Sequence, residues 1–227
     1  METQSQTSTA ASEKSVRHLR FCSIQAPEYP DHLLYKVTAI HSNNDLLAFG
    51  LEGGAIRVFD TEFDLISTIT GHSSAIIGLE ILSEDSLVSV SKTSCLVSRI
   101  EEDETIAEMS FYSNVAGFTV YRNYVIVSTM DKVLTILGHD SDELCVDAEF
   151  DLDITGSIVI REDPHIEQHA ELIVLSDGML SIFSIQGIGS GPKNWKFRKQ
   201  KDYYGNLTTV AAKSNTLVCG TMSSNIR

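Results

Sequence analysis

The chain has few prolines and little positive charge for its 227 residues. Three of its four prolines lie in predicted loops, and Pro192 ends a flexible connector that begins at Gly187. Lys and Arg total 17 against 31 for Asp and Glu, which gives a formal net charge of −14 at pH 7. Because phosphate backbones and anionic lipids repel an acidic protein, we expect neither nucleic acid nor a membrane as partner.

The cysteines are also few and widely separated: Cys22, Cys95, Cys145 and Cys219. They form no CxxC pair and have no histidine at ligand spacing, so neither a zinc site nor a redox motif is predicted, and no cofactor is expected. The first fifteen residues lack the apolar core of a secretory signal, and no run of about 18 apolar residues could span a bilayer. We therefore expect a cytoplasmic or nuclear protein with a disordered polar tail over residues 1–16.

What the sequence does contain is one short apolar strand after another, separated by Gly, Ser, Asn and Asp. Pairs of these strands form predicted hairpins near residues 46–60, 86–100, 124–137, 172–183 and 217–227. The ends of their first strands are separated by 40, 38, 47 and 45 residues. One further apolar strand precedes each hairpin, and a weaker strand follows each of the first four hairpins. The repeating unit within residues 17–227 therefore has four strands. This pattern predicts an all-β fold of about five four-stranded blades, with the last blade incomplete.

The segment Leu46–Asp60, with Gly71-His72 eleven residues later, resembles the WD40 repeat pattern LLASGSxDGTIRVWD…GH. The resemblance implies a WD40-like β-propeller with structural roles for six residues: Phe59, Asp60, His72, Asp131, Asp177 and Phe183. Asp131 and Asp177 are expected in tight turns, where an aspartate caps its own backbone. No repeat has Trp at the Trp-Asp position, so the hydrogen-bond network typical of the family should be mostly absent and apolar packing should hold the blades together.

Candidate catalytic and binding groups in the sequence are sparse. His139 also follows a glycine but is expected in a loop. The predicted innermost strands carry few carboxylates, and Glu80 is the exception. Gly50, Gly53 and Gly54 are expected to supply positive φ angles in one hairpin turn. The acidic runs 101–104 and 140–153 are interpreted as a solvated loop and an exposed outer strand, with recruitment of a basic partner as the alternative.

One basic group interrupts this acidic chain, and aromatic residues lie between its members: Lys193, Lys196, Arg198, Lys199 and Lys201. Stacking of nucleic-acid bases beside cations is one interpretation of such a group. The net negative charge instead favours an outer strand and loop that contact a partner protein.

The function that the resemblance implies is a non-enzymatic scaffold in a multiprotein complex. One alternative is a truncated or split gene product without a function of its own, and another is a propeller-fold hydrolase, since other propellers carry catalytic residues in the central channel. We expect other proteins as partners, bound through the propeller faces or through an unpaired edge of the last blade. The ring is either open or closed as five blades, with Arg17–Ile24 returning as the outer strand of the fifth.

Overall fold

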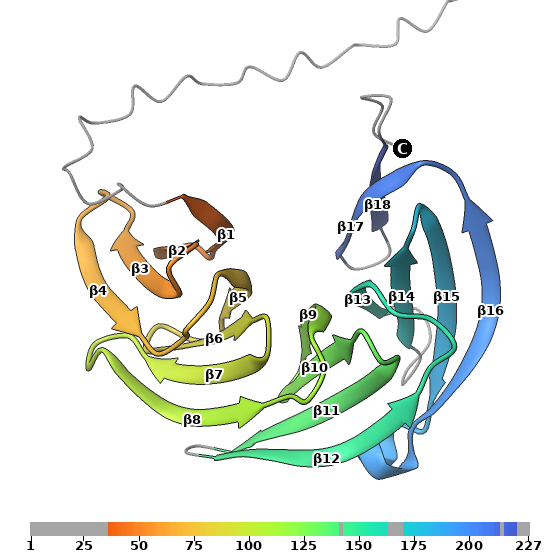
Figure 1. Ribbon diagram of the computed structural model, residues 1–227. Coiled ribbons are helices and arrows are strands. Elements are labelled where there is room, and N and C mark those ends of the chain that lie inside the picture. The colour runs from red at the N-terminus through yellow and green to blue at the C-terminus, as the bar shows by residue number, and fades with distance from the viewer. Residues whose placement is uncertain (1–35, 141–142, 163–169, 214–215, 222–227) are drawn as a thin grey trace, which may run out of the picture. The chain divides into compact units, whose positions relative to one another are not determined.

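The computed structural model describes residues 36–140, 143–162, 170–213 and 216–221 (Figure 1). They form eighteen β-strands and two short 3-10 turns, so the predicted all-β class is confirmed. None of the helical segments in this part of the chain is long and apolar enough to cross a membrane. The expected tail 1–16, the segment Arg17–Ile24 and the strand expected at Asn225–Arg227 all lie outside the described residues.

The strands form four antiparallel sheets of four strands and one sheet of two, each in chain order (Figure 1). The first sheet contains β1 (Val37–Ser42), β2 (Leu46–Leu51), β3 (Ala55–Asp60) and β4 (Leu65–Thr70). The second contains β5 (Ile76–Ile81), β6 (Ser86–Ser91), β7 (Ser94–Arg99) and β8 (Glu104–Ser110). The third contains β9 (Val115–Tyr121), β10 (Tyr124–Thr129), β11 (Val133–Asp140) and β12 (Glu143–Asp151). The fourth contains β13 (Ser157–Glu162), β14 (Ala170–Ser176), β15 (Met179–Gln186) and β16 (Lys196–Tyr204). The fifth contains β17 (Leu207–Lys213) and β18 (Thr216–Thr221).

Apolar side chains from neighbouring sheets form a separate core at each junction. The first and second sheets share a cluster that includes Ile56 and Leu87, and the second and third share one that includes Val97 and Val127. A third cluster joins the third sheet to the fourth, and a smaller one joins the fourth to the fifth. The first strand of each sheet contacts the first strand of the next, an arrangement consistent with a propeller-like fold.

This series of sheets is open in the described part of the chain. Apolar clusters join each sheet to the next, but none of them joins the fifth sheet to the first there, and β18 pairs with β17 alone. The fifth sheet therefore has two described strands where every preceding sheet has four.

Two sequence-based expectations about strand boundaries are wrong. The apolar strand that precedes the fourth predicted hairpin, expected over Ile154–Ile160, begins only at Ser157. The strand β11 continues to Asp140, so His139 lies in a ladder opposite Leu144 and not in a loop. The ladder between β11 and β12 continues beyond the buried apolar residues to the pair of Asp140 and Glu143. This hairpin is therefore longer than the repeat spacing implies.

The three glycines of the first hairpin do not all serve its turn. Only Gly54 has a positive φ, 86°. A Cβ at Gly54 would lie 2.2 Å from the His72 carbonyl oxygen, so the turn packs directly on the backbone that leads into the second sheet. Gly50 lies within β2, where a Cβ would lie 2.5 Å from Cγ2 of Ile76. Gly50 is therefore a packing glycine, which corrects the expectation for it.

The connector before β16 is folded and not a loose linker. Its two 3-10 turns, Ile188–Ser190 and Pro192–Asn194, place Ile188 and Pro192 in buried positions. Trp195 follows, 2% exposed, with its ring edge to face with those of Tyr121 and Tyr124 of the third sheet. The apolar residues among the glycines anchor this connector to the core between the third and fourth sheets.

Candidate functional site

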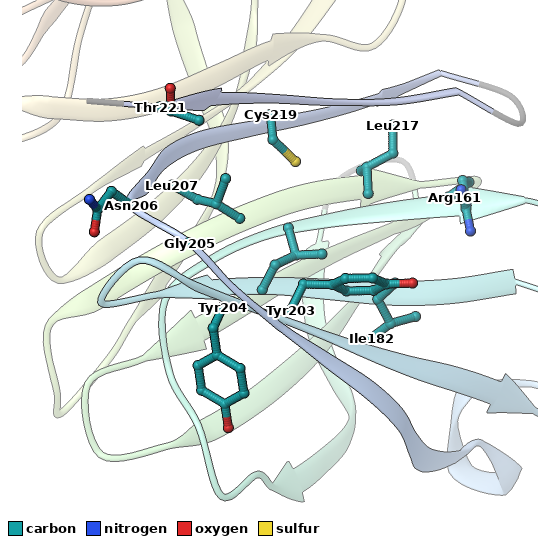
Figure 2. Close-up of a pocket in the computed structure, with 11 residues that line it drawn as sticks. Arg161, Ile182, Tyr203, Tyr204, Gly205, Asn206, Leu207, Leu217, Cys219 and Thr221 are labelled. Atoms are coloured by element: carbon teal, nitrogen blue, oxygen red, sulfur yellow. The ribbon is translucent and has the colours of Figure 1, made fainter. Parts of the chain in front are cut away.

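A groove of about 480 Å³ lies between the fourth sheet and the two-stranded fifth sheet (Figure 2). Its walls come from β15 and β16 on one side and from β17 and β18 on the other. In Figure 2, Leu217 and Cys219 project from β18 towards the fourth sheet, where Ile182 and Tyr203 lie. The groove is thus formed by facing side chains of two sheets that are consecutive in the chain.

The floor of the groove is apolar. Leu180 and Ile182 are 2% and 8% exposed, and they form a cluster with Leu207, Leu217 and Cys219 of the fifth sheet. Successive residues of a strand point to opposite faces, so the alternate residues of β15 and β18 supply both walls. Such walls favour a ligand with apolar side chains.

The fifth sheet covers the inner half of the fourth. The strand β17 contacts β13 and β14, the first two strands of the fourth sheet. Further out, Tyr203 and Tyr204 of β16 remain 44% and 82% exposed. If the fifth sheet had four strands like the preceding sheets, its third and fourth strands would lie over the outer half of the fourth sheet. The groove lies at the inner border of that outer half.

Positive charge lies at the rim of the groove. Lys201 pairs with Ile182 across the β15–β16 ladder, just as Tyr203 pairs with Leu180. Directly paired residues share one face of a sheet, so Lys201 projects on the groove side. Its Nζ lies 4.6 Å from the centre of the Tyr203 ring, a cation–π contact. Among the described residues no carboxylate pairs with Lys201.

The other cation of the groove, Arg161, is already neutralised. Its Nε donates a hydrogen bond to Glu171 Oε2 at 3.0 Å, and its Nη2 donates to the same oxygen. Both side chains are about one-fifth exposed, so solvent screens this pair less than a surface pair. The charge left available to a ligand is therefore that of Lys201.

Cys219 contributes a thiol to the groove, and burial raises its pKa. A raised pKa reduces the thiolate fraction at neutral pH, and the thiolate is the reactive form. The residue therefore serves as a small apolar part of the wall.

His72 sits in a cluster of serine hydroxyls at the junction of the first and second sheets. Its Nε2 lies 2.9 Å from Ser89 Oγ, and its Nδ1 lies 2.8 Å from Ser94 Oγ. Ser94 in turn lies 2.9 Å from Ser91 Oγ. Burial lowers the pKa of His72 to about 4, which a hydrogen bond with the Ser89 backbone only partly opposes. The ring is therefore neutral at pH 7 and satisfied within the fold.

Phe59 and Phe183 are both buried, but in different surroundings. Phe183 is 6% exposed in the core between the third and fourth sheets. Phe59 is 9% exposed and packs edge to face on Phe49, with ring centres 5.6 Å apart. It does not belong to the cluster between the first and second sheets, where its neighbour Val58 lies.

Of the three aspartates singled out in the sequence, Asp60 ends β3, while Asp131 and Asp177 lie in turns. Asp60 Oδ1 accepts hydrogen bonds from the backbone N–H groups of Glu62 and Asp64, both at 2.9 Å. Asp131 accepts a hydrogen bond from Thr129 Oγ1 at 2.5 Å, which holds the pKa of Asp131 below its usual value. Asp177 has a φ of 47°, and with Gly178 at 78° it forms the two-residue turn between β14 and β15.

These six residues therefore stay distributed over three sheets and their junctions, and they do not converge on one site. The groove contains different residues. In the sequence, Lys201 belongs to the basic group expected to form an outer strand and loop that contact a partner protein, and nothing there relates it to Leu217 and Cys219. The apolar residues of β15 and β18 were the only signal for the walls, and they do not say which sheets face each other.

The serine cluster was also missed. Ser89, Ser91 and Ser94 interrupt apolar strands at short intervals, and this is the one signal that could have found them. Glu80, the carboxylate noted on an innermost strand, is partly buried, and its burial raises its pKa. It lines a separate polar hollow with Arg122 and Tyr124 between the second and third sheets.

Comparison with known proteins bears on the fold alone. No protein-family model matches the chain, and no curated protein matches it. Among solved structures, the crystal structure of the computationally designed Ika8 protein is similar, with a TM-score of 0.56 and 13% sequence identity. The match covers 85% of this chain and 70% of that one. The computationally designed Ika4 protein matches at a TM-score of 0.46 and 14% identity, over 86% of this chain and 90% of that one.

Proposed function

We propose that this chain is a divergent WD40-type propeller module that acts as a non-enzymatic scaffold for protein–protein interaction. Strand pairs recur at separations of 38 to 47 residues, close to the roughly 40 to 45 residues of a WD40 blade, and this recurrence supports the propeller interpretation. In it, each four-stranded sheet is one blade, and β17 and β18 are the first two strands of a fifth.

One observation carries the scaffold function: the apolar groove beside the two-stranded fifth sheet. A groove with walls from Leu180, Ile182 and Leu217 offers area that a partner can remove from water. The exposed tyrosines at its outer side are of the residue type enriched in protein interfaces. The net charge of −14 further favours proteins over nucleic acid or anionic membranes.

Affinity purification of the tagged full chain from its own cells, with quantitative mass spectrometry, tests this proposal. We expect a recurring set of proteins at stoichiometric abundance. The Leu217→Asp variant should lose at least one of them, because it places a charge in the apolar wall. Val218→Asp is the matched control, since this side chain points to the opposite face of β18 and is already 41% exposed. If no protein recurs with the wild-type chain, the scaffold proposal is wrong.

A further inference from the structure

We infer that the hollow between the second and third sheets receives a basic side chain, lysine or arginine, of a partner protein, and that Glu80 is the carboxylate that binds it. This inference rests on the proposed scaffold function and names the chemistry of one contact with the partner. Three observations carry it: the make-up of the hollow, the charge of Glu80 and the residue at the matching position of the first sheet.

The hollow has a volume of about 500 Å³ and lies between two hairpins. One hairpin joins β5 to β6, and the other joins β9 to β10. Ile81 and Val125 line the hollow and are buried, whereas Ser83 and Asn123 line it from the exposed turns. The lining is therefore apolar at depth and polar at the rim. A lysine or arginine side chain suits such a site, because its apolar stem carries a charged end.

Glu80 brings a negative charge to the lining of this hollow. The side chain is partly buried, and burial raises its pKa, an effect that a hydrogen bond with the Val120 backbone partly opposes. No lysine or arginine among the residues that the structure describes forms an ion pair with Glu80. Because less water surrounds this carboxylate, a cation beside it is screened less than a cation beside an exposed carboxylate.

Arg122 also lines the hollow, but other groups hold its guanidinium. Its Nη2 and Nε donate hydrogen bonds to Glu162 Oε1 at 3.1 and 3.3 Å. The guanidinium carbon lies 5.1 Å from the centre of the Tyr121 ring, a cation–π contact. Glu162 therefore balances the charge of Arg122, and Glu80 leaves the hollow with a net negative charge.

His41 occupies the matching position of the first sheet and shows that the fold needs no charge there. His41 pairs with Ala48 as Glu80 pairs with Val88, and the two pairs are 39 and 40 residues apart in the chain. His41 Nδ1 accepts a hydrogen bond from the Ile81 backbone N–H at 3.2 Å, and burial lowers the pKa of the ring, which is neutral at pH 7. A neutral acceptor is thus enough for a link to the next innermost strand. The charge of Glu80 is available for a ligand.

The surroundings of the hollow also favour a basic partner. Glu84 and Asp85 are exposed in the turn between β5 and β6. The whole chain has a formal net charge of −14, so its field attracts basic segments and repels acidic ones. A basic residue that protrudes from a partner therefore meets an attractive field on approach and a partly desolvated carboxylate in the hollow.

Four short peptides test the inference on the wild-type chain. Each has one central residue, arginine, lysine, citrulline or acetyl-lysine, between glycine and serine residues, and both ends are blocked. Citrulline and acetyl-lysine are the neutral counterparts of arginine and lysine. Nuclear magnetic resonance of the isotope-labelled full chain follows binding at each backbone amide. We expect a basic peptide to bind about tenfold more tightly than its neutral counterpart, with shifts concentrated at residues 80–86 and 120–125.

Two glutamine variants then locate the bound cation. Glu80→Gln removes the charge but keeps an oxygen that can accept the Val120 hydrogen bond, so it should weaken the basic peptide about tenfold and leave the neutral ones unchanged. Glu84→Gln is the matched control, because it removes an equal charge from the exposed turn, and it should change binding less than about twofold. Both variants must melt like the wild-type chain. The comparison of basic with neutral peptides needs no variant and stays decisive if Glu80→Gln fails to fold.

Affinity purification extends the test to whole partner proteins. Glu80→Gln should lower the recovery of at least one recurring protein about tenfold, and Glu84→Gln should not. The inference is wrong if neither basic peptide binds more tightly than its neutral counterpart, if the shifts spread over the whole acidic surface, or if the two variants weaken binding equally. If partner proteins recur while the peptides fail, the scaffold proposal stands and only this inference falls.

Discussion

The carboxylate of Asp103, in the turn between β7 and β8, accepts a hydrogen bond from the Ser67 hydroxyl at 2.5 Å. The same Oδ1 atom accepts one from the Thr68 backbone N–H at 3.1 Å. Ser67 and Thr68 belong to β4, the outer strand of the preceding sheet. An acidic run that the sequence indicates as a solvated loop therefore supplies a polar link between the outer edges of two sheets.

We expect Asp103→Gly to lower the free energy of unfolding by about 1 to 3 kcal/mol. Glycine tolerates the φ of 53° at this position, so the substitution does not strain the backbone. The loss of unfolding free energy then reports the two missing hydrogen bonds and the Ser67 hydroxyl, which loses its partner while the residue is only 3% exposed. Glu102→Ala is the control, because its ion pair with Arg99 is exposed, and it should change stability by less than about 0.5 kcal/mol. Urea denaturation of both variants makes the comparison, and equal losses would show that the Asp103 link does not contribute.

Stability should fall as the pH falls from 6.5 towards 4, in part because of His72. The native ring stays neutral down to about pH 4, whereas the unfolded ring takes up a proton near pH 6.5, so the unfolded state binds more protons in this window. The His72 contribution is on the order of 3 kcal/mol over the whole window, at about 1.4 kcal/mol per pH unit. Denaturation of the wild-type chain and of His72→Gln, measured from pH 4 to pH 7, should give a steeper slope for the wild type.

His41 makes the same-signed contribution, since burial lowers its pKa as well, so only the difference between the two proteins reports on His72. Parallel pH profiles would mean that His72 is solvated in the native state. At pH 7 the His72→Ala variant should lose about 1 to 3 kcal/mol, because the hydroxyls of Ser89 and Ser94 lose their partner.

Two adjacent glycines should respond in opposite ways to alanine. Gly54→Ala should cost about 2 to 4 kcal/mol, because the new Cβ meets the His72 carbonyl and the φ of 86° is strained for an L residue. Gly53→Ala should be neutral or stabilising by up to about 1 kcal/mol, because nothing lies within 4 Å and alanine restricts the unfolded chain. Thermal unfolding monitored by circular dichroism distinguishes them, and similar melting points would disprove the assigned turn.

Phe59→Ala should destabilise the fold by about 3 to 5 kcal/mol, through loss of buried ring area and of the packing on Phe49. Leu65→Ala on the neighbouring strand is a suitable control, since Leu65 is 44% exposed and should cost less than about 1 kcal/mol. Chemical denaturation of both proteins gives the two values. A Phe59→Ala protein that unfolds like the wild type would place that ring in solvent.

Most of the strands could be predicted because hairpin formation depends on neighbours in the sequence. The hairpin of β2 and β3 follows from apolar runs on either side of a glycine-rich turn, and β14 and β15 follow from the Asp177-Gly178 pair. Errors arose where another part of the chain decides the outcome. The extra length of β11 depends on pairing with β12, and the role of Gly50 depends on Ile76, which lies in the next sheet.

The sequence by itself determined the all-β class, the spacing of the repeat and the acidic surface, because periodicity, turn residues and charge act over short separations. Only the tertiary structure decided which faces meet. The groove requires β15 and β16 to lie across from β18, and the link from Asp103 to Ser67 joins residues 36 positions apart. The two-residue period of a strand tells which side chains share one of its faces. Which other face they pack against depends on the packing of whole sheets. Apolar burial is non-directional, so this packing has no local signature in the sequence.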